Sequence, residues 1–105
     1  MKYNDYYSYK YVIGHSYYDS FTEKETVIYD SDTESFYGGN IWVENILEAK
    51  RFDSYEDVMN QITNNKSRYE GGFSIVNVPD CTWEAIKKDE DLRRKYNNPY
   101  YALRG

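Results

Sequence analysis

The chain has 105 residues, a formal net charge of −5, 19% aromatic residues and a mean hydropathy of −0.95. This length suffices for one domain with its own core, without metal or disulfide staples. One cysteine, Cys81, excludes an internal disulfide, and one cysteine with one histidine cannot form the cage of N and S ligands that zinc prefers. We therefore expect a single domain over residues 1–105, with no metal and no cofactor.

The compartment is inferred from hydropathy and from the start of the chain. No apolar run approaches the roughly 20 residues that a membrane-spanning helix requires. The first residues also lack the charged, apolar and small-residue pattern of a secretory signal. We expect a cytoplasmic protein of a host cell, with no membrane partner. Both a monomer and a homodimer are compatible with the sequence.

The first part of the chain has the pattern of β-strands. Residues 7–13 alternate in the period-2 manner of a half-buried strand, and we expect Gly14 to bend or end it. Residues 26–29 are β-branched and aromatic and predict a second strand, followed by a polar turn at residues 30–32. A short third strand is expected at residues 35–37, closed by a glycine pair. A meander is the simplest connection.

The second part favours helices around one more strand. Residues 46–52 have helical spacing, and Ser54 is an expected N-cap for a ten-residue helix with one apolar stripe. Residues 73–78 are the most strand-like run and the best candidate for a central strand, and a last helix is expected over residues 83–96, capped by Asp80 or Thr82. The sequence thus predicts an α+β domain: a small antiparallel β-sheet of three or four strands, with two or three helices packed on one face.

Negative charge and aromatic residues gather in one stretch of the sequence. Residues 17–48 hold eight acids against one base, a local balance of −7, and seven of the 14 tyrosines fall in the first eighteen residues. Carboxylates spaced along two strands would imitate the phosphates of a duplex and occupy a channel lined by Lys and Arg, with aromatic anchors between them. We predict binding by Asp19, Glu23, Glu25, Asp30, Asp32 and Glu34 through charge, and by Tyr17, Tyr18, Tyr29 and Tyr37 as anchors.

Three other interpretations of the charged residues stay open. The acids are also what the solvated face of an ordinary soluble protein carries. Paired carboxylates such as Asp30 with Asp32 would suit acid–base or metal-dependent chemistry, but no pattern singles out one pair, and we predict a non-enzymatic protein without catalytic residues. A small nucleic-acid-binding or scaffold protein would use the last helix, although the net charge opposes direct nucleic-acid binding. Its basic residues are Lys87, Lys88, Arg93, Arg94 and Lys95.

The middle of the chain carries a distinctive block after two predicted strands. It runs Trp42-x-x-x-Ile46-x-x-Ala49-Lys50-Arg51-Phe52-x-x-Tyr55-x-x-Val58, and a strand follows it. This arrangement, over residues 9–78, resembles a recurrent type of small early protein of bacteriophages and mobile elements, among whose neighbours are anti-CRISPR inhibitors. The resemblance implies a phage-type inhibitor that binds a host protein or ribonucleoprotein effector, foremost a CRISPR nuclease complex, and blocks entry of DNA or RNA.

Overall fold

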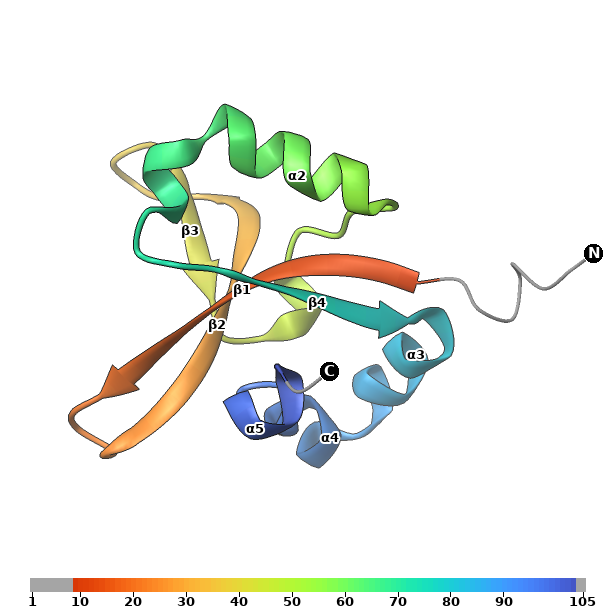
Figure 1. Cartoon of the computed structure of the whole chain (residues 1–105). Coiled ribbons are helices and arrows are strands. Elements are labelled where there is room, and N and C mark those ends of the chain that lie inside the picture. The colour runs from red at the N-terminus through yellow and green to blue at the C-terminus, as the bar shows by residue number, and fades with distance from the viewer. Residues whose placement is uncertain (1–8, 104–105) are drawn as a thin grey trace, which may run out of the picture.

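The computed structural model describes residues 9–103, in which four strands form one antiparallel sheet (Figure 1). The strands follow the order β3-β2-β1-β4 across the sheet. Their bounds are β1 (Tyr9–Asp19), β2 (Lys24–Glu34), β3 (Asn40–Val43) and β4 (Ser74–Pro79). The helices are η1 (Ile46–Glu48), α2 (Tyr55–Asn64), η2 (Lys66–Tyr69), α3 (Asp80–Lys88), α4 (Glu90–Lys95) and α5 (Pro99–Ala102). The predicted α+β class with a small antiparallel sheet is confirmed.

Two apolar clusters lie on opposite faces of the sheet. Val12 belongs to one cluster and its neighbour Ile13 to the other, because successive side chains of a strand point to opposite faces. Helix α2 covers the face of Ile13, and helices α3, α4 and α5 lie on the opposite side (Figure 1). The helices therefore cover both faces, not the single face that we expected. A sheet that is apolar on both faces must be covered on both.

The two central strands are longer than predicted. β1 continues through Gly14, where a Cβ would lie 3.1 Å from Cγ1 of Val27 and 3.4 Å from Cε1 of Tyr29. Glycine here makes room for the neighbouring strand and does not end β1. β2 continues through residues 30–32, which we expected to form a turn. The predicted strand over residues 7–13 matches β1 from Tyr9 onward, and residues 7 and 8 lie outside the described residues.

The two edge strands also differ from the prediction. Residues 35–37, the expected third strand, lie in the loop between β2 and β3, and β3 begins at Asn40. β4 agrees with the predicted strand at residues 73–78, but it lies at the edge of the sheet and pairs with β1. The central positions belong to β1, which pairs with β2 and β4, and to β2, which pairs with β1 and β3.

Local capping signals explain which helices formed as predicted. Ser54 caps α2, and its hydroxyl accepts a hydrogen bond from the Asp57 backbone nitrogen at 3.1 Å. The segment 46–52 forms only the short η1. The long predicted last helix is interrupted at Asp89, which caps α4 instead. α3 begins directly after Pro79, without the side-chain cap that we expected. Among residues 9–103, no helix is long and apolar enough to cross a membrane.

Candidate binding surface at the β1–β2 hairpin

The ten residues predicted to bind do not form one surface. β2 is extended, so the nine steps from Glu25 to Glu34 separate their Cα atoms by about 30 Å. Tyr29 and Asp30 lie between these ends and are buried. Three residues are placed at the far end of β2 and in the loop after it: Asp32, Glu34 and Tyr37. Five remain at the hairpin that joins β1 to β2: Tyr17, Tyr18, Asp19, Glu23 and Glu25.

Tyr29 is a core residue and not an anchor for a partner. Its side chain is 0% exposed and belongs to the cluster on the α3 side of the sheet. The hydroxyl donates a hydrogen bond to the backbone carbonyl of Tyr96, and burial raises the pKa of Tyr29 above its ordinary value. The contact fixes the end of α4 onto the sheet. The prediction for Tyr29 is wrong because aromatic pattern does not distinguish core from surface.

Asp30 is equally inaccessible, at 1% exposure, and serves as the centre of a buried polar network. Its Oδ1 accepts hydrogen bonds from Nε of Arg68 at 3.0 Å, from Nη2 of Arg68, and from the Ser31 backbone nitrogen at 3.0 Å. Its Oδ2 accepts from the hydroxyl of Tyr69, which itself accepts from Nε2 of Gln61 at 3.2 Å. The network joins β2, η2 and α2. The predicted surface charge at Asp30 is therefore wrong, because its charge is already neutralised within the chain.

The Tyr69 hydroxyl gives this network a dependence on pH. Burial, and then the hydrogen bond to Asp30, raise the pKa of Tyr69 to about 12. An unfolded tyrosine titrates near 10, so Tyr69 contributes stability that is complete below about pH 10 and is lost as the pH rises toward 12. We expect the difference in unfolding free energy between wild type and Tyr69→Phe to be constant below pH 10 and to shrink above it. Urea unfolding followed by circular dichroism measures this difference, and a value that stays constant through pH 12 would refute the assignment.

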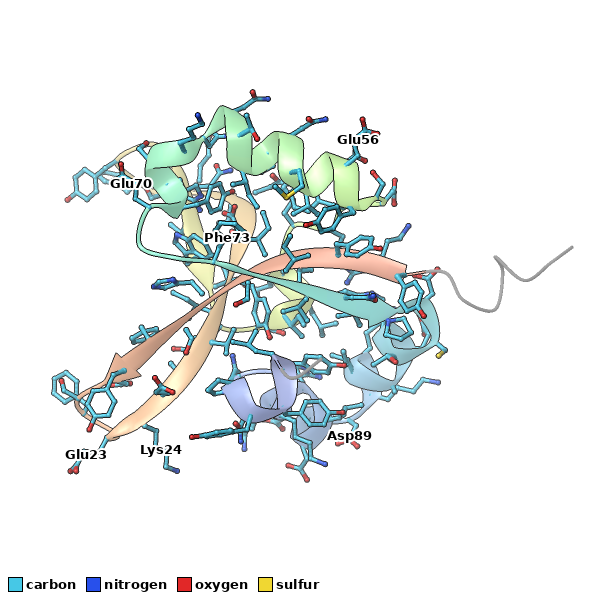
Figure 2. The ribbon with its side chains drawn as sticks, viewed as in Figure 1. Glu23, Lys24, Glu56, Glu70, Phe73 and Asp89 are labelled. Carbon is cyan, nitrogen blue, oxygen red and sulfur yellow. The ribbon has the colours of Figure 1, made fainter. Side chains whose placement is uncertain are left out.

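The β1–β2 hairpin is closed by a tight acidic turn. The backbone nitrogen of Glu23 donates to the Asp19 carbonyl at 2.7 Å, and that of Phe21 donates to Oδ1 of Asp19 at 2.9 Å. Glu23 adopts a φ of 57°, in the left-handed region, as the turn requires. Phe21 at the tip is 97% exposed. Figure 2 shows Glu23 and Lys24 at this tip, which extends away from the body of the molecule.

A groove of about 780 Å³ lies between this hairpin and the C-terminal helices. Its acidic lining residues outnumber the basic ones four to two, and Arg94 already pairs with Glu90 at 2.6 Å. The charged lining residues are Asp19, Glu23, Glu25, Glu44, Lys24 and Arg94, and three tyrosines join them: Tyr17, Tyr18 and Tyr100. The groove thus combines negative charge with aromatic surface. All five hairpin residues predicted to bind line it.

Asn97 holds the C-terminal wall of the groove in place. Its Nδ2 donates to the carbonyls of Val27 at 2.9 Å and Glu44 at 2.7 Å. Its own carbonyl accepts from the Val27 backbone nitrogen at 2.9 Å. The sequence indicated only that Asn97 ends a helix, since its partners lie 70 and 53 residues away along the chain. Nine groove residues were outside the predicted binding set, and six of them lie far from the hairpin in the sequence and were missed for this reason: Glu44, Arg94, Asn97, Asn98, Pro99 and Tyr100.

The basic residues of the last helices are largely engaged within the chain. Arg93 donates to the carbonyls of Ile86 and Lys87, both at 3.3 Å, at the C-terminal end of α3. Lys87 lies 3.8 Å from Glu84, and Nζ of Lys95 lies 5.8 Å from the centre of the Tyr101 ring. With Arg94 paired to Glu90, four of the five basic side chains have internal partners. The pairs of Lys87 and Arg94 are largely exposed, so these two side chains remain accessible to solvent.

Asp30 and Asp32, the pair considered above as an example for acid–base chemistry, do not converge on a common point. Asp30 is buried, whereas the Asp32 side chain is 71% exposed and lies 3.4 Å from Nζ of Lys50. Within the described part of the chain, no group of three or more His, Cys, Asp or Glu residues is placed to hold a metal ion.

Comparison with protein-family models, with curated proteins and with solved structures finds no match for this chain. The function of the hairpin groove must therefore be inferred from its residues and geometry.

Proposed function

We propose that this protein is a non-enzymatic binding protein whose β1–β2 hairpin end docks on a basic, nucleic-acid-binding surface of another protein and blocks entry of DNA or RNA. The observation that carries the proposal is the groove in which four carboxylates and three tyrosines meet at one end of the sheet. A surface that binds nucleic acid is rich in Lys and Arg, because its affinity comes from neutralising phosphates. An acidic hairpin would compete with nucleic-acid phosphates for the same Lys and Arg side chains.

The aromatic residues of the groove supply binding affinity, which charge alone does not provide. Charged groups across an interface mainly set association rate and specificity, whereas affinity is concentrated in buried aromatic and Arg anchors. Tyr18 is 61% exposed and Tyr100 is 81% exposed, on opposite walls of the groove. Phe21 adds an exposed ring at the hairpin tip. Arg side chains of a partner would find both a carboxylate and a ring face in the groove.

We infer the class of partner from the expected resemblance of residues 9–78 to small early proteins of phages and mobile elements. In that setting, an acidic inhibitor acts in the host cytoplasm on a defence nuclease, and a CRISPR effector complex is the foremost candidate. Charge supports the same choice, since a net charge of −5 is complementary to a channel lined by Lys and Arg. The protein acts by occupying that channel and performs no chemistry itself.

Affinity capture with competition tests this function. The tagged protein is immobilised, a bacterial lysate containing CRISPR effectors is passed over it, and the retained proteins are identified by mass spectrometry. We expect a nuclease effector to be retained and to be released by added duplex DNA or guide RNA, because both ligands need the same basic surface. Retention of nucleic acid itself, or retention of an effector that nucleic acid does not displace, would refute the proposal.

A further inference from the structure

The loop between β2 and β3, residues 35–39, presents two aromatic side chains that contact almost nothing else in the described chain. Phe36 is 95% exposed and Tyr37 is 93% exposed, and their rings meet edge to face with centroids 5.3 Å apart. The loop follows the end of β2 opposite to the hairpin, and neither ring lines the groove. Phe36 and Tyr37 therefore belong neither to the core nor to the groove.

This loop is held in one conformation by its own hydrogen bonds. The backbone nitrogen of Ser35 donates to the Gly39 carbonyl at 2.8 Å, and that of Gly38 donates to the Ser35 carbonyl at 3.1 Å. The Ser35 hydroxyl donates to the Gly38 carbonyl at 2.6 Å. Gly38 and Gly39 have φ values of 90° and 77°, which side-chain-bearing residues rarely adopt. The loop backbone thus forms a defined turn, and this turn presents both rings to solvent.

The charges beside the loop indicate the chemistry of its partner. Glu34 is exposed on the strand that leads into the loop, as is Asp32, which lies 3.4 Å from Nζ of Lys50, and residues 35–39 themselves carry no charge. Two rings flanked by carboxylates complement an apolar pocket that has Lys or Arg at its rim. The same carboxylates would be repelled by the anionic headgroups of a cytoplasmic membrane surface. A protein pocket is therefore favoured over a lipid surface.

We propose that Phe36 and Tyr37 form a second contact site, which inserts into an apolar, basic-rimmed pocket of the partner protein that the hairpin groove also binds. The inference rests on the proposed function for the identity of that partner. Two contacts at opposite ends of β2 would be engaged together, and the second would bind at high effective concentration. The loop contributes slow dissociation, whereas the acidic hairpin contributes fast association.

Site-specific photo-crosslinking tests this second contact. The crosslinking amino acid p-benzoylphenylalanine is placed at position 36 in the loop, at 21 in the hairpin tip, or at 55 as a control on α2, where Tyr55 is 56% exposed. After irradiation with the effector complex retained by affinity capture, we expect adducts from positions 21 and 36 on the same protein. The position-36 adduct should map to apolar residues bordered by Lys or Arg, and position 55 should give little product.

The outcomes separate the two proposals. Adducts from position 21 alone, or from position 36 onto lipid, would overturn the second site and leave the proposed function standing. Position 36 could instead give adducts on a protein that stays bound to the double variant Glu23→Lys with Glu25→Lys. This outcome would overturn the proposed function but retain a loop site.

Dissociation kinetics provide a second test. The double variant Phe36→Ala with Tyr37→Ala should dissociate about 30-fold faster than wild type, as expected when hot-spot residues are lost. An unchanged dissociation rate would overturn the second site, and Tyr55→Ala is the matched control.

Discussion

Replacement of Asp30 by alanine should lower the free energy of unfolding by about 2–4 kcal/mol, because it leaves the half-buried guanidinium of Arg68 and the buried hydroxyl of Tyr69 without their acceptor. Arg68 would lose its hydrogen bonds to Oδ1, and the Tyr69 hydroxyl would lose its acceptor Oδ2. The guanidinium of Arg68 lies 5.0 Å from the centre of the Trp42 ring, a contact that does not replace a carboxylate. Urea denaturation at neutral pH, followed by tryptophan fluorescence and circular dichroism, measures the loss.

Asp32→Ala is the matched control for this variant. Asp32 lies two residues along the same strand, and its pair with Lys50 is largely exposed. An exposed ion pair of this kind contributes about 0–1 kcal/mol, so this variant should unfold close to wild type. Equal losses for the two variants would mean that the buried network does not stabilise the fold as described.

Charge reversal at the hairpin should have the largest effect on binding. Glu23→Lys with Glu25→Lys removes two of the four groove carboxylates and introduces two cations. Because complementary charge steers association, we expect the association rate with the captured effector to fall about tenfold or more at low salt. Both residues are exposed, so the fold should be retained. Surface biosensor kinetics with the immobilised variant measure the rate.

The control for this charge reversal is a second pair of Glu→Lys substitutions, placed outside the hairpin. Glu56→Lys with Glu70→Lys shifts the formal charge equally, but both side chains lie on the α2 side of the molecule, away from the hairpin tip (Figure 2). This variant should associate at nearly the wild-type rate, apart from a small loss of helix stability at the start of α2. Equal slowing in both variants would indicate an effect of net charge and would contradict a specific hairpin contact.

The elements that could be predicted are those specified by neighbouring residues. α2 follows from the Ser54 cap and from apolar residues at helical spacing, and both act within one or two turns. The strand character of β4 follows likewise from its run of β-branched residues. Its position at the sheet edge could not be predicted, because pairing with β1 joins residues such as Val12 and Val76 that are far apart in the sequence.

The candidate site was predicted in part, and its errors have a common physical cause. The hairpin acids were found because they follow one another in the sequence and share one turn. Asp30 belongs to the same acidic stretch, but its partner Arg68 lies 38 residues away, so nothing local reveals that it is buried. The extended backbone of β2 then divides the remaining acids between two ends of the sheet. Charge density along a sequence thus does not measure charge density on a surface.

The salt dependence of association between the wild-type protein and the captured effector distinguishes electrostatic docking of the hairpin from other modes of binding. Raising ionic strength from about 0.1 M to about 1 M shortens the screening length from about 10 Å to about 3 Å. If the acidic hairpin end steers docking on a basic surface, the association rate should fall by tenfold or more across this range, and Glu23→Lys with Glu25→Lys should flatten the dependence. An association rate that is constant with salt in the wild-type protein would contradict the account.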